Sequence, residues 1–147
     1  MDETEIRMLQ LGHEGFYCSQ IIVILGLELR GEENPALVRS LAGLAYGCGA
    51  GRGTCGALTG GACLLGLYAG KGASEEEESP KLMVMLQELA DWFAARVGPE
   101  CPGVTCELIT GEKGPEDSRQ ECGSLVHDVY VRALELLQEN GFDPYGG

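Results

Sequence analysis

The chain has 147 residues and a formal net charge of −13, and 44% of its residues are hydrophobic but only 6% aromatic. This length and composition fit one globular domain, expected to span residues 1–147, with a core of aliphatic side chains. The acidic charge argues against binding to nucleic acid, which requires clusters of Lys and Arg, and it disfavours anionic membrane surfaces for the same reason.

Apolar residues recur with helical spacing along the chain, and no stretch of useful length alternates as a strand does. Six helices are therefore predicted, over residues 2–13, 17–29, 35–47, 54–69, 80–97 and from residue 118 to a stop at 140–141. Short connections favour an antiparallel arrangement, so the expected fold class is all-α, a single-domain bundle of about six helices.

The first three predicted helices each carry one apolar stripe that should face the core. In the first helix the stripe comprises Ile6, Leu9 and His13. In the second helix the stripe begins at Cys18. In the third helix the stripe consists of leucines, and its next member is Cys48.

The remaining helices are predicted from their composition and their capping signals. The fourth helix is rich in glycine and apolar on all sides, so it is expected to be buried at the centre of the bundle. Ser79 is the predicted N-cap of the fifth helix, with Pro80 at its first position. A capping box over residues 118–121 opens the sixth helix, and Gly141 ends it.

The chain is cysteine-rich, with seven cysteines, and its other features predict a cytoplasmic protein. The N-terminus is acidic where a secretory signal is basic, and no apolar stretch reaches the roughly 20 residues of a membrane span. No membrane insertion is therefore expected. In a reducing compartment, a cysteine-rich chain indicates metal binding, an iron–sulfur cluster or redox chemistry.

Four cysteines are candidates for one functional site. Cys18, Cys55 and Cys122 stand at the starts of predicted helices and in line with their core stripes. Unpaired N–H groups and the helix dipole favour negative charge there, which predicts a lowered thiol pKa. Cys106 is the natural fourth member. These four are predicted to meet in one pocket, where they act as catalytic thiols or as metal ligands.

Several chemistries remain open for four thiols. The sequence has no Cys-x-x-Cys, so zinc-ribbon and thioredoxin interpretations lose their signature, and it has no haem attachment motif. Thiols from distant residues could hold an iron–sulfur centre or cycle between dithiol and disulfide. The alternatives are a structural zinc site in a helical binding module, or a binding module without a cofactor, including a homodimer that packs through the glycine-rich helix.

The other cysteines and the two histidines are weaker candidates. Cys63 lies well inside the fourth helix and fits a packing role. Cys48 and Cys101 are candidates for a resolving thiol. His13 and His127 are expected in surface or boundary positions, with a ligand or proton-transfer role as the lesser alternative.

A glycine-rich loop precedes the fourth helix. Gly51, Gly53 and Gly56 match G-x-G-x-x-G, but a helix precedes them where a dinucleotide-binding unit has a strand, so nucleotide binding is rejected. Gly51 and Gly53 are instead expected to bring backbone N–H donors close to Cys55, with Arg52 adding positive charge. Gly51, Arg52 and Gly53 are therefore cofactor-binding candidates.

Two segments share the pattern Cys-x-x-x-Thr-Gly, at residues 55–60 and 106–111. A match of this length is weak evidence of duplication. It does predict that both segments do the same local job.

The arrangement of these motifs resembles the family of redox-active proteins named for the C_GCAxxG_C_C pattern. The resemblance runs over Tyr17-Cys18-Ser19-Gln20, the glycine loop with residues 54–61, residues 106–111 and Cys122. Position by position, the four family cysteines fall on Cys18, Cys55, Cys106 and Cys122. Cys48, Cys63 and Cys101 are extra.

The resemblance implies a bacterial or archaeal thiol-based oxidoreductase or electron carrier that works with a redox partner protein, often in anaerobic metabolism. A similar domain attached to multihaem cytochrome segments favours an iron–sulfur cluster, although the present chain has no haem motif.

Overall fold

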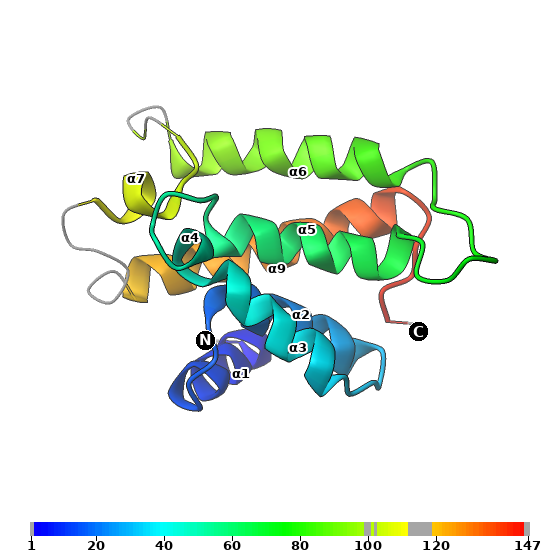
Figure 1. Ribbon diagram of the computed structural model, residues 1–147, viewed down its shortest axis with the longest axis horizontal. Coiled ribbons are helices and arrows are strands. Elements are labelled where there is room, and N and C mark those ends of the chain that lie inside the picture. The colour runs from blue at the N-terminus through cyan, green and yellow to red at the C-terminus, as the bar shows by residue number, and fades with distance from the viewer. Residues whose placement is uncertain (1, 99–100, 102, 112–118, 146–147) are drawn as a thin grey trace.

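The computed structural model describes residues 2–98, 101, 103–111 and 119–145 (Figure 1). The predicted all-α class is confirmed, because the described residues form helices and a single isolated β-bridge. None of the described helices is long and apolar enough to cross a membrane. The elements are α1 (Glu3–His13), α2 (Cys18–Leu29), α3 (Pro35–Leu41), the 3-10 helix η1 (Ala42–Leu44), α4 (Ala45–Cys48), α5 (Gly56–Ala69), α6 (Leu82–Val97), α7 (Cys106–Thr110) and α9 (Arg119–Glu139).

Helix α5 is the centre of the bundle, as predicted. It packs against α2, α6 and α9, and its leucines Leu64 and Leu65 are fully buried. Its glycines permit this close packing. A β-carbon on Gly60 would lie 3.0 Å from the Cα of Ser19 in α2, and one on Gly61 would lie 2.5 Å from Val129 in α9. Small residues on α5 therefore set the distance to both neighbouring helices.

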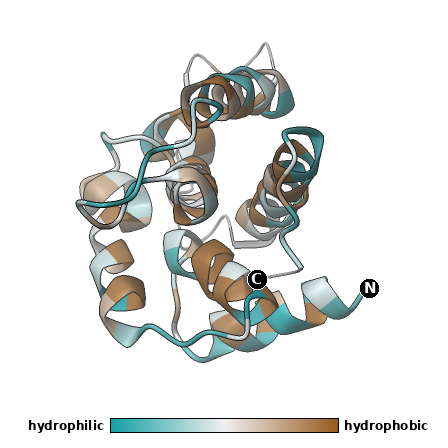
Figure 2. Ribbon diagram, turned by 90° about the vertical axis from the view of Figure 1, so that its right-hand side faces the viewer, coloured by the Kyte–Doolittle hydropathy of each residue, from teal (hydrophilic) through white to brown (hydrophobic). Residues whose placement is uncertain are grey.

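The hydrophobic core is made mostly by α2, α5, α6 and α9. Figure 2 shows hydrophobic and hydrophilic residues on different sides of several helices of the bundle. The predicted core face of α9 is confirmed for its apolar members, since Leu125, Val126, Val129, Ala133, Leu136 and Leu137 are buried. A smaller cluster forms between α2 and α3 around Val23, Leu27 and Leu41. Cys63 packs against this smaller cluster, which agrees with its predicted packing role.

The predicted core face of α1 is wrong. Met8 and Leu11 are buried, whereas Ile6 is 46% exposed and Leu9 is 52% exposed. His13 is exposed as well. Apolar residues occur on two sides of this helix, and the side that packs against α2 and α9 is the one with Met8 and Leu11.

The predicted third helix ends early. After α3 the chain passes through η1 into α4, where Tyr46, Gly47 and Cys48 have positive φ angles of 54°, 63° and 62°. Gly49 continues this left-handed turn with φ 83°. Cys48 is therefore exposed and is not the next member of the leucine stripe. Glycine lowers helix stability and tolerates positive φ, so a glycine-rich segment favours such a turn.

Helix ends differ slightly from those predicted. Helix α6 begins at Leu82, two residues after Pro80, and the N–H of Leu82 donates to the carbonyl of Ser79. The predicted N-cap of α9, Ser118, lies outside the described residues. The predicted end of α9 is confirmed, since Gly141 has φ 89° and the side-chain amide of Asn140 donates to the carbonyl of Leu136.

Candidate functional site

The four predicted cysteines line one cavity of about 730 Å³. Four different helix starts bring them there. Cys18 is the first residue of α2, Cys55 is the N-cap of α5, Cys106 is the first residue of α7, and Cys122 lies in the first turn of α9. The beginnings of α5, α7 and α9 lie at one end of the bundle, on the left of Figure 1.

The two Cys-x-x-x-Thr-Gly segments lie side by side through a short antiparallel bridge between Thr54 and Thr105. The N–H of Cys55 donates to the carbonyl of Val104 at 2.8 Å, and the N–H of Cys106 donates to the carbonyl of Gly53 at 3.1 Å. Each segment then begins a helix immediately after the bridge. The prediction that both segments do the same local job is confirmed by this pairing.

The threonines of the two segments also have equivalent positions. The hydroxyl of Thr110 donates to the carbonyl of Cys106 at 2.8 Å, and that of Thr59 lies 3.4 Å from the carbonyl of Cys55. Both hydroxyls bond one turn back along their helices, although the bond of Thr110 is the shorter. The first turn that carries each cysteine is thus held by its own threonine.

Burial dominates the electrostatics of the thiols. Burial first, and then the nearby Cys55 thiol, account for most of the rise in the pKa of Cys18 to about 12. The N–H of Ser19 lowers this pKa, and the thiols of Cys122 and Cys106 raise it by smaller amounts. Since a charge on Cys18 is opposed by all three of the other cysteines, the four thiols are close enough to interact.

The same balance holds for two of the other thiols. Burial raises the pKa of Cys55 although the N–H groups of Ala57 and Leu58 act against it, and burial raises the pKa of Cys106 against the hydroxyl of Thr110. The prediction that helix starts lower the thiol pKa is therefore wrong for Cys18 and Cys55. Helix-start N–H groups do favour the thiolates, but the loss of water around the sulfur outweighs them.

This donor set suits two kinds of chemistry. Four cysteine sulfurs are the ligands of iron–sulfur clusters and of structural zinc, and a cation would offset the mutual repulsion of the thiolates. No disulfide joins the cysteines in the described part of the chain, so dithiol oxidation is also open to them. Within the described residues, no three Cys, His, Asp or Glu side chains lie close enough together to hold a metal ion.

The glycine loop supports α7. The N–H of Gly51 donates to the carbonyl of Tyr46 and that of Gly53 to the carbonyl of Gly47, so both predicted donors have partners within the loop. The carbonyl of Gly51 accepts from the N–H of Glu107 at 2.7 Å. Arg52 is exposed and is not among the residues that line the cavity. The cofactor-binding role of Gly51, Arg52 and Gly53 stays a prediction.

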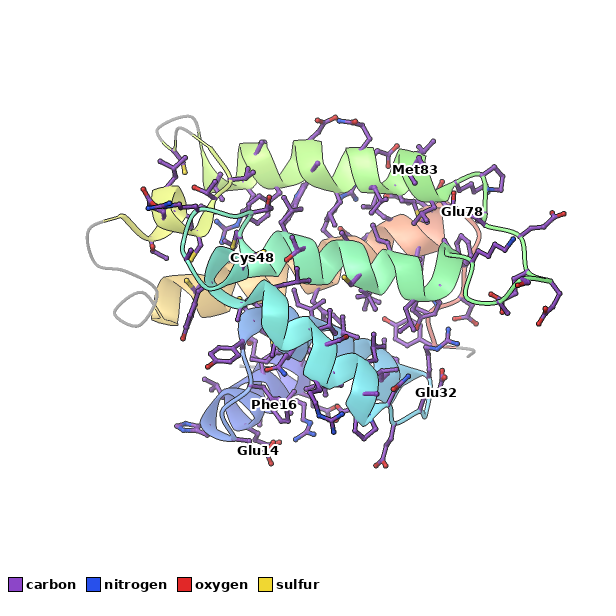
Figure 3. The ribbon with its side chains drawn as sticks, in the orientation of Figure 1. Glu14, Phe16, Glu32, Cys48, Glu78 and Met83 are labelled. Atoms are coloured by element: carbon purple, nitrogen blue, oxygen red, sulfur yellow. The ribbon has the colours of Figure 1, made fainter. Side chains whose placement is uncertain are left out.

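The three extra cysteines lie outside the cavity lining. Cys48 is exposed in α4, at the same end of the bundle as α7 (Figure 3). The half-buried thiol of Cys101 donates to the carbonyl of Gly103 at 3.0 Å. Cys63 is half-buried, and burial raises its pKa.

The cavity is also lined by Tyr46, which the sequence did not single out, and by His127, which was named there only as a lesser candidate. Tyr46 lines it from the left-handed turn, and its ring meets that of Tyr17 edge to face at 5.2 Å. His127 lines it from α9, with one ring nitrogen 3.3 Å from Asp128 and the other 3.6 Å from Asp2. No sequence motif marks these residues, because turns and helices far apart in the chain bring them together.

A comparison with protein families gives one match. The model described as "Putative redox-active protein (C_GCAxxG_C_C)" matches residues 16–136, which includes all four cysteines of the cavity. No curated protein and no solved structure matches the chain.

Proposed function

The chain belongs to the C_GCAxxG_C_C family, and from this premise we propose that Cys18, Cys55, Cys106 and Cys122 form one redox site. The observation that carries the proposal is that these four cysteines line the same cavity although they come from four different helices. The site either holds an iron–sulfur centre for electron transfer or cycles between dithiol and disulfide.

The residues fit an iron–sulfur centre by their donor chemistry. Four cysteine sulfurs are the ligand set of such centres, which supply one-electron transfer when bound. The role of the protein is to hold the four sulfurs and to limit the access of water. Cys55 and Cys106 are 7% and 6% exposed, so two of the four sulfurs lie deep in the protein.

The dithiol form needs only the residues of the chain. When two thiols join as a disulfide, they release two electrons and two protons to an acceptor. Cys18 and Cys55 are the first pair to consider, because the Cys55 thiol is the neighbour that most raises the pKa of Cys18. Their raised pKa values keep the thiols protonated near neutral pH, so the reduced state is a pair of neutral groups.

The deciding experiment is anaerobic purification followed by assays of iron, sulfide and free thiols. Iron and sulfide bound to the wild type and lost in Cys55→Ser would support the cluster. A colourless protein that loses two thiols per chain on mild oxidation and regains them on reduction would support the dithiol form. Cys63→Ala is the matched control, since this cysteine lies on the same helix and outside the cavity lining.

Structural zinc is tested by the same preparation, because four thiolates are also a zinc ligand set. A zinc-containing protein that unfolds in chelator and shows no thiol cycling would overturn the redox proposal. A protein with neither metal nor reversible thiol loss would overturn it as well.

A further inference from the structure

The cavity extends beyond the four thiols. Its volume of about 730 Å³ falls within the roughly 300–1,000 Å³ typical of pockets for small organic molecules. Its lining also includes Met8 and Leu9 of α1 and Phe16 and Tyr17 of the segment that leads into α2. Thiols and apolar or aromatic side chains therefore line the same cavity.

One aromatic residue of the cavity lining, Tyr46, has an unfavourable backbone conformation. Tyr46 has φ 54°, which costs a non-glycine residue about 1–2 kcal/mol. This conformation places Tyr46 in the cavity lining, where its ring contacts Tyr17 edge to face. Strain of this kind concentrates at binding and catalytic sites.

The charges in the cavity disfavour anions. Among the described residues, no lysine or arginine lines the cavity, whereas Glu5 and Asp128 do. Asp128 is paired with Arg96 at 2.8 Å, and His127 lies between Asp128 and Asp2. In the described part of the lining, phosphate, carboxylate and sulfonate groups would therefore meet no lysine or arginine, only the imidazoles of His13 and His127.

The cavity is open to solvent along an apolar edge. Leu9 is 52% exposed and Tyr17 is 40% exposed, yet both line the cavity. An exposed apolar edge at the entrance of a pocket is typical of a ligand-binding site. A ligand that enters past Leu9 and Tyr17 would reach the cavity that the four cysteines line.

We propose that this cavity binds a small, uncharged aromatic molecule between its aromatic residues and its thiols. The ligand's role as redox substrate rests on the proposed function, and a quinone is the class that fits it. A quinone is planar and uncharged, and its reduction to the hydroquinone takes up two electrons and two protons. Closing a disulfide between two thiols of the site supplies both.

Binding is tested with a matched pair of fluorescent probes on the reduced, full-length protein. N-phenyl-1-naphthylamine is uncharged, and 1-anilinonaphthalene-8-sulfonate has the same aromatic framework with a negative charge. We expect the uncharged probe to bind at least about tenfold more tightly, because the described lining offers the sulfonate no lysine or arginine and contains the acidic residues Glu5 and Asp128. Equal binding of the two probes would overturn the assignment.

Location is tested with two variants of α1. Leu9→Glu should weaken binding of the uncharged probe about tenfold or more, because it replaces an apolar side chain of the cavity lining with a charged one. Ile6→Glu is the matched control: Ile6 is 46% exposed on the same helix, and it is not among the lining residues. Equal effects of the two variants would place the probe elsewhere and overturn the proposal.

The substrate role is tested with duroquinone, whose fully substituted ring resists addition of a thiol. It should displace the bound probe and be reduced to its hydroquinone with the loss of two thiols per chain. Probe binding without reduction of duroquinone would overturn the quinone assignment. The iron and thiol assays are independent of probe binding, so failure of the cavity and failure of the redox site give different results.

Discussion

The sulfur of Cys18 lies directly against Gly56, so that a β-carbon on Gly56 would be 2.7 Å from it. The same β-carbon would lie 3.3 Å from the carbonyl oxygen of Leu44. A side chain at residue 56 therefore requires movement of the first turn of α2 or of the chain that leads into α4. Gly56 follows Cys55, so this close approach also sets how near Cys18 comes to the second thiol.

Gly56→Ala should lower the free energy of unfolding by about 1–3 kcal/mol, because the methyl group overpacks this contact. Gly66→Ala on the same helix has open space around its β-carbon, so it should raise that free energy by about 0.5–1 kcal/mol through helix propensity. Urea unfolding of both variants checks the prediction. A stabilised Gly56→Ala protein would contradict the packing described here.

Stability should fall at alkaline pH through the buried thiols. The pKa of Cys18 is raised from 9.0 to about 12 in the folded protein, so the folded state holds its proton more tightly than the unfolded state does. The resulting stabilisation is complete below pH 9 and is lost as the pH rises to about 12, by up to about 1.4 kcal/mol per pH unit and thiol.

Urea unfolding of the reduced protein at pH 8 and pH 10 measures this loss. Cys18→Ser removes one titrating thiol and keeps the tyrosines, whose ionisation also contributes. The variant should therefore lose less stability over this interval than the wild type. An identical loss would show that Cys18 does not titrate with a raised pKa.

The two threonines of the repeated pattern should differ in importance. Thr110→Val removes a buried hydrogen bond of 2.8 Å and should cost about 1 kcal/mol. Thr59→Val removes a longer bond and should cost less. Because the hydroxyl of Thr110 lowers the pKa of Cys106, its loss should also slow alkylation of Cys106 at a fixed pH. Urea unfolding and mass spectrometry of alkylated peptides measure the two effects.

Cys48→Gly should stabilise the protein. Cys48 is exposed and has φ 62°, and glycine adopts this conformation without the penalty of about 1–2 kcal/mol that a β-carbon brings. Cys48→Ala keeps the β-carbon and should give no such gain. Calorimetric melting of both variants separates strain from any effect of the thiol, and the metal and thiol content of the site should stay unchanged in both.

The helices could be predicted from the sequence because their apolar residues recur on one side. Helices α2, α5 and α6 lie within two residues of their predicted starts. The face of α1 could not be predicted, since apolar residues occur on two sides and only contact with α2 and α9 decides between them. Ile6 and Leu9, which looked like core residues, belong to the exposed side.

The gathering of Cys18, Cys55 and Cys122 could also be predicted, because each one stands at the start of a predicted helix in line with its core stripe. Cys106 was added as the natural fourth member, although no helix was predicted at α7. The direction of the thiol pKa shifts could not be predicted. A helix start lowers a thiol pKa by a local effect that is visible in the sequence, whereas burial raises it by an amount set by the whole fold. Tyr46 was missed for a related reason, since its left-handed backbone has no signal in residue type.

The cavity is lined by residues of both α2 and α9, so its cysteines are synthesised far apart in time. Cys122 follows Cys18 by 104 residues. At a synthesis rate of about 5–20 residues per second, Cys122 is added to the chain roughly 5–20 s after Cys18. During this interval Cys18 is a solvent-accessible thiol without the burial that later keeps it protonated. Premature oxidation or capture by a stray metal ion is thus a hazard of synthesis, since the set of four thiols is complete only after Cys122 has been added.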